Sequence, residues 1–375
     1  MFAYLDNSAT TRPCPEAVAA MVEALETGWG NPSSLYRFGM DAAHRLKAAR
    51  DQVAKALGAE PDRVFFTSGG TEADNWAIFS AMSRMGKRGR HVITTAVEHH
   101  AVLNPMRRLE EQGFEVTYLK PDALGRVCLD ALREAIRPDT VLVSVMMVNN
   151  ESGAVMPIGA MAKLTHRLAP NAIFHTDAVQ GFLKLPFQAK TLGADLISIS
   201  SHKVHGPKGA GALYIRRGLP LPPYLLGGGQ EGGYRSGTEA TPAVVGFGAA
   251  CAAALPTLRE DLAREAALRD RSAALLAEIP GVELLGAREA PHILLASIPG
   301  VPTQNTINIL QDHGVCVSAG SACARGHRSH VLEAMGLPPE TVDGAFRISL
   351  SRFTSPEELC LLYTSPSPRD RTRSR

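Results

Sequence analysis

The chain has 375 residues, of which 45% are apolar and 20% are charged. This composition excludes a disordered chain, a collagen and a coiled coil, and the length predicts at least two domains. The 39 basic and 37 acidic residues give a net charge of +2. Residues 360–375 contribute four arginines and one aspartate, so the rest of the chain carries a net charge of −1. No electrostatic case for nucleic-acid binding remains.

The sequence carries no signal for secretion or for membrane insertion. The apolar stretch Ala243–Leu255 contains two glycines and is shorter than the ~20 residues that cross a bilayer. Met1–Asp6 lacks the basic region of a secretory signal. The six cysteines form no Cys-x-x-Cys pair, which is typical of reduced thiols. We therefore expect a cytoplasmic protein.

Short apolar and β-branched runs alternate with helical patterns over the first 255 residues. The runs predict strands at Arg63–Thr67, His91–Thr95, Glu115–Leu119, Thr140–Val148, Ala172–Thr176, Asp195–Ser200 and Gly211–Ile215. Apolar residues recur at helical spacing between them, as in Ala42–Leu57. The alternation predicts an α/β fold with a mostly parallel seven-stranded sheet, in which ligands bind at the carboxyl ends of the strands.

A break near Leu255-Pro256 divides the chain. We expect a large domain over residues 15–255 and a smaller α+β domain formed by residues 1–14 and 256–359. The smaller domain is expected to contain helices at Leu258–Ile279, Pro302–Asp312 and His330–Met335, and strands at Gly281–Leu285, His292–Ile298 and Gly314–Val317.

Residues 360–375 differ in composition from the rest and show no periodicity. Ser355–Leu359 has the N-cap serine, N1 proline and acidic first turn of a helix, which we expect to stop after one turn. Cys360–Asp370 matches the translation of a sequencing-adapter oligonucleotide. We expect 360–375 to be a non-native tail that replaces a native C-terminus; a disordered basic tail is the alternative.

The strongest chemical signal lies in Ser198–Gly209, where a strand runs into Lys203 and a glycine-rich turn. A lysine at a strand end in a cleft can act as an imine-forming amine; a solvated surface lysine is the alternative. Asp177 ends another strand, and Gln180 follows it. A pyridoxal 5'-phosphate (PLP) ring needs a carboxylate at its nitrogen, and Gln180 could donate to the ring oxygen. A helix N-cap is the ordinary alternative for Asp177.

Two further strand ends carry binding signals. In Phe66–Ala73, Gly70 lets the backbone approach a phosphate and Thr71 adds a hydroxyl, although a plain turn fits equally. The P-loop and dinucleotide-binding glycine patterns are absent here, so a nucleotide is disfavoured. His99, in Glu98-His99-His100, could stack on a cofactor ring or simply begin a helix.

Two cysteines lie in Gly314–Gly326. Cys316 belongs to an apolar run and is expected to be an inert core thiol. Cys323 is surrounded by Gly, Ser and Ala, and a cysteine in such a loop is a candidate nucleophile. Cys316, Cys323, His327 and His330 form a cluster in the sequence, but their spacing fits no common zinc pattern, and we expect no metal site.

With these residues, the chain resembles the cysteine desulfurases, PLP-dependent enzymes of iron–sulfur cluster assembly and nitrogen fixation. They belong to the class V aminotransferase-like group of PLP fold type I, which is the fold that the resemblance implies. It covers Tyr4–Leu359, and further motifs that carry it are Tyr4-Leu-Asp-Asn-Ser-Ala-Thr-Thr11, Gly30-Asn-Pro-Ser-Ser34, Val148-Asn-Asn-Glu151, Gly211-Ala-Leu-Tyr214, Arg235-Ser-Gly-Thr238 and Arg347-Ile-Ser-Leu-Ser-Arg-Phe-Thr354.

The resemblance implies a role for each site residue. Lys203 would hold PLP and move the substrate Cα proton, while Cys323 would take the sulfur of cysteine as a persulfide and release alanine. Asp177 would pair with the ring nitrogen, Gln180 with the phenolic oxygen, and His99 would stack on the ring. The phosphate would be held by Gly70, Thr71, Ser200, His202 and, from the second subunit of a homodimer, Thr238; Asn150 and Arg347 would bind the substrate carboxylate.

The resemblance also bears on partners. Ser-Ala-Gly-Ser-Ala-Cys323 is similar to the long-loop branch that serves scaffold proteins, so a sulfur acceptor or scaffold protein is expected, without nucleic acid or membrane. Without the family's C-terminal segment, we expect reduced stability and weak partner binding. The open alternatives are a selenocysteine lyase or another class V PLP enzyme, and an inactive truncated fragment. A non-catalytic assembly partner is disfavoured because Lys203 and Asp177 are present.

Overall fold

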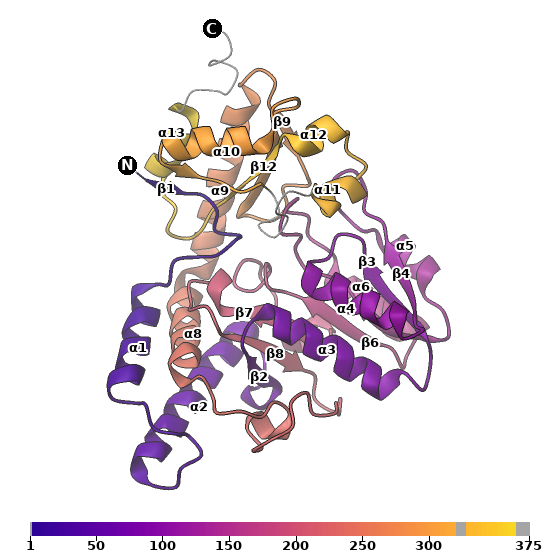
Figure 1. Ribbon diagram of the computed structural model, residues 1–375, viewed down its shortest axis with the longest axis vertical. Helices are drawn as coiled ribbons and strands as arrows, with labels where there is room; N and C mark the ends of the chain where they lie inside the picture. The colour runs from indigo at the N-terminus through magenta and orange to yellow at the C-terminus, as the bar shows by residue number, and fades with distance from the viewer. Residues whose placement is uncertain (1, 320–327, 365–375) are drawn as a thin grey trace.

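A seven-stranded sheet forms the centre of the computed structural model, which describes residues 2–319 and 328–364 (Figure 1). Its strands are β2 (Val64–Thr67), β3 (His91–Thr95), β4 (Glu115–Leu119), β5 (Thr140–Ser144), β6 (Ile173–Asp177), β7 (Leu196–Ser200) and β8 (Gly211–Ile215). The order is β2-β8-β7-β6-β5-β3-β4. Strand β8 runs antiparallel to β2 and β7, and the other pairs are parallel. The predicted mostly parallel sheet of seven strands is confirmed.

The central strands β5, β6 and β7 are buried along their whole length, as expected for parallel strands covered on both faces. The strand expected at Thr140–Val148 is shorter in the structure. Strand β5 ends at Ser144. Beyond it, Val145 and Met147 still donate their N–H groups to the carbonyls of His175 and Asp177 on β6, whereas Met146 donates to the Glu98 carboxylate. The apolar run therefore stays beside β6, while the N–H of Met146 binds a side chain.

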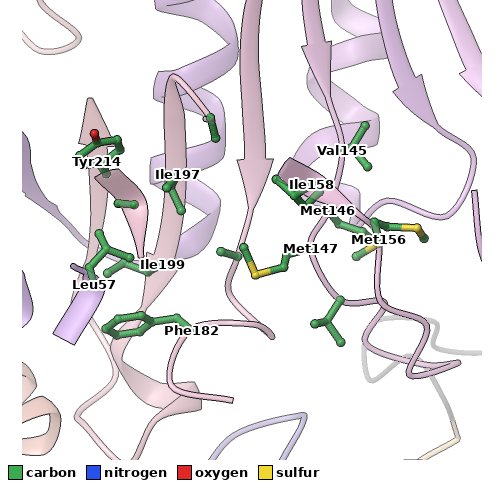
Figure 2. Packing of buried hydrophobic residues seen from close by; sticks show 14 of the residues in the cluster. Leu57, Val145, Met146, Met147, Met156, Ile158, Phe182, Ile197, Ile199 and Tyr214 are labelled. Carbon is green, nitrogen blue, oxygen red and sulfur yellow. The ribbon is translucent and has the colours of Figure 1, made fainter. Parts of the chain in front are cut away.

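Helices cover both faces of the sheet (Figure 1). One face packs against α3 (Gly70–Met85) and α4 (His100–Glu111). The other face packs against α2 (Arg37–Leu57), α5 (Leu129–Ala135), α6 (Ile158–Leu168), α7 (Ala189–Leu192) and α8 (Thr241–Ala254). Figure 2 shows part of this second core, where Ile197, Ile199 and Phe182 pack together with other apolar side chains. Short 3-10 turns lie at Pro61–Arg63 (η1), Ser201–Lys203 (η2) and Glu231–Gly233 (η3).

Helix α8 continues through a 3-10 turn, Leu255–Thr257 (η4), into α9 (Leu258–Ala277). By length and composition alone, the run Thr241–Ala277 could cross a membrane. In the fold, however, α8 packs against α2 and against α1 (Pro15–Glu26), with Phe247 and Cys251 fully buried. Helix α9 carries charged residues along its length. The run therefore behaves as a core helix followed by a charged helix.

The C-terminal part of the chain builds a three-stranded sheet in the order β12-β10-β9 and a short pair, β1-β11. Its strands are β1 (Ala3–Tyr4), β9 (Glu283–Leu285), β10 (Ile293–Ser297), β11 (Val315–Cys316) and β12 (Ala345–Ser349), and its helices are α10 (Thr303–Asp312), α11 (His330–Ala334), α12 (Pro339–Asp343) and α13 (Pro356–Thr364). The sequence analysis did not expect α12 or β12. Helix α13 reaches Thr364, beyond the single turn expected, and buries Leu359 and Leu362.

Strand β1 brings the N-terminus to the C-terminal part of the fold (Figure 1). The chain then crosses toward the large sheet. The side chain of Asn7 donates to the backbone oxygen of Ser349 at 3.0 Å, and Thr11 donates its N–H to the carbonyl of His202 at 2.9 Å. Residues 6–11 therefore lie between the two sheets and form one wall of the site.

Candidate active site

A cavity of about 240 Å³ opens near the carboxyl ends of β5, β6 and β7. It brings together most of the residues that the sequence singled out: Gly70, Thr71, His99, Asn150, Asp177, Gln180, Ser200, His202, Lys203 and Arg347. Thr238 is exposed and does not line this cavity. Cys323 lies outside the described residues.

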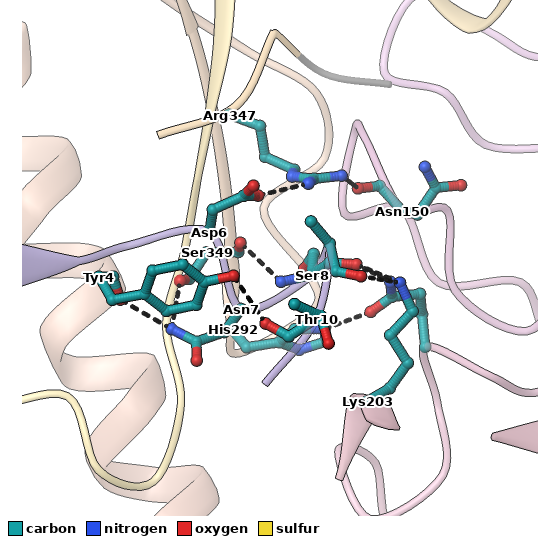
Figure 3. Close-up of polar contacts among 12 residues, drawn as sticks. Tyr4, Asp6, Asn7, Ser8, Thr10, Asn150, Lys203, His292, Arg347 and Ser349 are labelled. Atoms are coloured by element: carbon teal, nitrogen blue, oxygen red, sulfur yellow. Dashed lines mark hydrogen bonds and ion pairs between the residues drawn. The ribbon is translucent and has the colours of Figure 1, made fainter. Parts of the chain in front are cut away.

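Lys203 ends η2, directly after β7, and extends its side chain to the N-terminal segment (Figure 3). Its Nζ donates to the backbone carbonyls of Ser8 at 2.6 Å and Ala9 at 2.8 Å. Burial, followed by the positive charges of Arg347 and Lys184, lowers the pKa of Lys203 to about 7. A large fraction of this amine is therefore neutral and nucleophilic at physiological pH.

Asp177 is the last residue of β6 and is buried. Its Oδ1 accepts the N–H of Val179 at 2.8 Å, so the carboxylate caps the turn that follows. No helix begins at this turn, so the helix N-cap considered from the sequence is not formed. Burial, and then the neighbouring Asp74, raise the pKa of Asp177 to about 7. Gln180 donates from Nε2 to the carbonyl of Ser8 at 2.9 Å. A buried carboxylate whose pKa is raised in this way is well suited to pair with a protonated ring nitrogen.

His99 begins a helix and also lines the cavity. Its Nδ1 accepts the N–H of Ala101 at 3.1 Å and caps α4, while the ring lines the cavity. Burial, and then the charge of Lys203, lower the pKa of His99 to about 4. The imidazole is therefore neutral at physiological pH, with Nδ1 as the acceptor, and offers an uncharged ring face to the cavity.

The loop before α3 and the end of β7 together form a cradle for an anion. A Cβ at Gly70 would lie only 2.7 Å from a methyl of Val179, so a side chain there would require Val179 to move. The Ser200 hydroxyl is buried and has no hydrogen-bond partner among the described residues. With the hydroxyl of Thr71 and the free N–H groups at the start of α3, this donor set fits a phosphate.

Arg347 projects from β12 and is almost fully buried. Its Nη2 lies 2.8 Å from Oδ1 of Asp6, and its Nη1 donates to the carbonyl of Asn150 at 2.7 Å (Figure 3). Its Nε has no hydrogen-bond partner within the described ranges. A guanidinium at the mouth of the cavity is the group that best recognises a carboxylate.

The described residues on either side of the range 320–327 are held beside this cavity. On one side, Ser318 exchanges backbone hydrogen bonds with Arg347, at 2.7 and 3.1 Å. On the other side, the Ser329 hydroxyl donates to Glu151, and Nε2 of His330 donates to the carbonyl of Glu98 at 2.9 Å. Glu151 and Glu98 neighbour Asn150 and His99 in the chain, so both attachment points border the site.

Sequence reasoning missed Asp6, Ser8, Ala9 and Asp74. The first three lie in the motif that begins at Tyr4, which was noticed only as part of the resemblance. Asp74 lies in the second turn of α3, close behind the glycine loop, and lines the cavity. An acidic residue at a helix start is common on a protein surface, so its burial could not be inferred from the sequence.

Residues 3–362 match the family described as Aminotransferase class-V, so the chain belongs to that family. A cysteine desulfurase of Trichormus azollae is 44% identical over 361 residues, which cover 95% of this chain and 90% of that protein. A solved structure described as a NifS-like protein has a TM-score of 0.92 and 37% identity, with 97% of each chain covered. A second, described as SspA in complex with cysteine, has a TM-score of 0.79 and 34% identity, covering 94% of this chain and 100% of that one. The chain belongs to the cysteine desulfurases, and its fold is PLP fold type I.

The lowered pKa of Lys203 predicts an unusually reactive amine. Acetylation of the apoprotein by a small activated ester, followed by peptide mass spectrometry, should show Lys203 reacting with a midpoint near pH 7. Ordinary lysine amines, with a pKa of about 10.4, should react at more alkaline pH. A Lys203 profile that coincides with that of the exposed lysines would show that burial does not lower the pKa of Lys203.

Proposed function

We propose that the protein is a PLP-dependent cysteine desulfurase that converts L-cysteine to L-alanine and transfers the sulfur through Cys323 to an acceptor protein. The observation that carries the proposal is the convergence of Lys203, Asp177 and Arg347 on one cavity, in a chain 44% identical to a protein named cysteine desulfurase. The substrate proposal is supported by the solved relative described in complex with cysteine.

The residues in the cavity fit PLP. When bound, this cofactor acts as an electron sink that stabilises negative charge at the substrate Cα. Asp177 faces the ring nitrogen in this proposal, Gln180 the phenolic oxygen and His99 the ring. The buried Ser200 hydroxyl, which has no partner among the described residues, finds one in the phosphate. The remaining phosphate contacts come from Gly70, Thr71 and His202.

The residues of the chain have separate roles in the proposed reaction. Lys203 holds the cofactor through its amine and later, as a general base, moves the proton of the substrate Cα. Arg347 and Asn150 hold the substrate carboxylate; Arg347 exchanges its contact with Asp6 for the substrate. The Cys323 thiol bonds to the substrate sulfur as the carbon–sulfur bond breaks. Cysteine and thiol thus become alanine and a persulfide, and no external oxidant or reductant is consumed.

Exposed apolar side chains on α1, on the loop between α1 and α2 and on the start of α2 support a homodimer. They are Val18, Val22, Leu25, Trp29, Leu35, Tyr36 and Met40, of which Trp29 is 70% and Leu35 94% exposed. A large apolar patch of this kind marks an interaction surface. In the proposed dimer, the exposed Thr238 completes the phosphate site of the second subunit.

Three broader features belong to the same proposal. The large domain comprises residues 15–255, and the small domain comprises residues 1–14 and 256–359, with 360–375 as a non-native tail. The protein works in the cytoplasm. Its sulfur acceptor is a scaffold protein of iron–sulfur cluster assembly, to which Cys323 would pass the sulfur.

The function is tested by alanine released from L-cysteine, measured with PLP-loaded parent protein and two variants. Lys203→Ala removes the general base and should lower the rate by at least about 100-fold. Cys323→Ser removes the sulfur acceptor and should reduce alanine to background. The amount of alanine that the parent releases should be proportional to the amount of sulfur that it transfers to an added acceptor thiol.

Two outcomes would overturn this function. Equal alanine from the parent and Cys323→Ser would indicate a lyase or another class V enzyme that does not use this thiol. No alanine from a parent that retains PLP would indicate a different substrate or an inactive chain. Leu168→Ala, which changes an exposed residue on α6, is the matched control and should behave as the parent.

The dimer is tested by Leu25→Glu combined with Trp29→Glu. Two buried carboxylates would oppose association, so the variant should elute as a monomer in size-exclusion chromatography with light scattering. It should also bind PLP more weakly, because Thr238 of the second subunit is lost. Leu168→Glu, at an exposed apolar position outside the patch, should remain dimeric. A monomeric parent, or an unchanged double variant, would exclude this interface.

A further inference from the structure

Asp74 is a buried carboxyl group that the proposed reaction leaves without a role. It is 1% exposed and lines the same cavity as Lys203 and Asp177. Its Oδ1 has no hydrogen-bond partner among the residues that the structure describes. Since burying a polar atom without a partner costs free energy, this position calls for a specific explanation.

Asp74 lies above a row of polar side chains that crosses the sheet beneath α3. His175 and Asp177 are two residues apart on β6 and therefore point to the same face. Nε2 of His175 lies 3.0 Å from the Ser198 hydroxyl and 3.5 Å from Oδ1 of Asp74, and its Nδ1 lies 2.8 Å from the Ser144 hydroxyl. The histidine thus connects Asp74 to the strand that carries Asp177.

The charges around this row do not balance if every carboxyl group is ionised. Asp74, Asp177 and Glu98 are all buried, and Glu98 is held by Thr95 and by the N–H of Met146. Burial lowers the pKa of His175 to about 4, so this ring is neutral. Among the described residues, the basic groups that act on Asp177 are His175, which is neutral, and Lys203, which is only partly protonated near neutral pH. These groups cannot offset three carboxylates in a dry site.

The lack of positive charge determines which of the three carboxyl groups carry a proton. Burial raises the pKa of Asp74 to about 7, and burial together with the charge of Asp74 raises the pKa of Asp177 to about 7. Burial raises the pKa of Glu98 well above its usual range, and Asp177 and Asp74 raise it further. Near neutral pH, Glu98 is therefore protonated, and Asp74 and Asp177 compete for one further proton.

We propose that Asp74 is a positioning residue for the cofactor's ring: its carboxyl group competes with Asp177 for one shared proton, and this competition sets the pH below which Asp177 stops holding the ring nitrogen. This inference rests on the proposed function. When Asp74 is ionised, its like charge favours the shared proton on Asp177, and a protonated Asp177 has no charge to offer the ring nitrogen. Asp74 acts through Asp177 and His175 and does not take part in the chemistry.

Asp74→Asn tests the inference because it keeps the shape of the side chain and removes its charge. Apoprotein is titrated with PLP between pH 5 and 9, and binding is followed by protein fluorescence. Without the like charge, the pKa of Asp177 falls, so PLP binding should survive to lower pH. We expect the acid midpoint of binding to move down by at least about 1 pH unit. Asp74→Glu, which keeps an ionisable group, should retain the parent's midpoint.

Ser80→Ala is the matched control, because Ser80 is also buried on α3 but does not line the cavity. It should keep the parent's midpoint. If Asp74→Asn does not fold, Asp74→Ser carries the same expectation. A midpoint equal to the parent's in the neutral variants would overturn this role for Asp74 and leave the desulfurase proposal intact. A parent that binds no PLP at any pH would overturn both.

Discussion

Lys203 carries its amine into a cavity where its hydrogen bonds go to two neutral carbonyls, those of Ser8 and Ala9. Burial therefore favours the uncharged amine, and the charges of Arg347 and Lys184 add to this preference. The arrangement depends on the N-terminal segment, which β1 anchors to β11 in the C-terminal part. The pairing of two residues at the start of the chain thus supports the reactivity of a lysine two hundred residues away.

The same burial governs the other groups of the site. His99 and His202 become neutral, because burial lowers the pKa of each to about 4, and Asp177 retains a proton more readily than an exposed carboxyl group. A ligand that brings its own positive ring nitrogen and its own phosphate would satisfy Asp177 and Ser200 together. In the apoprotein, the burial of these groups is therefore electrostatically unfavourable, and a cofactor with complementary charges would relieve it. This explains the residue roles proposed above.

Much of the large sheet could be predicted from the sequence. Strands such as β3, β4 and β8 were placed at their observed bounds, because each is a short apolar run between turn residues. Strand β12 was missed, although Arg347 within it was singled out, because its pairing with β10 joins segments far apart in the sequence. Lys203 and Asp177 were found at strand ends, where polar residues interrupt apolar runs. Asp74 and Ser8 were not, because their roles arise from burial and backbone contacts that only the fold creates.

Every proposed step requires that Lys203 hold the cofactor. The most direct measurement is to incubate the protein with PLP, reduce it with borohydride, digest it and locate the modified lysine by mass spectrometry. The account predicts one dominant pyridoxyl adduct, on the peptide that contains Lys203, and its loss in Lys203→Ala. A dominant adduct on Lys184, or adducts spread over exposed lysines such as Lys190, would contradict it.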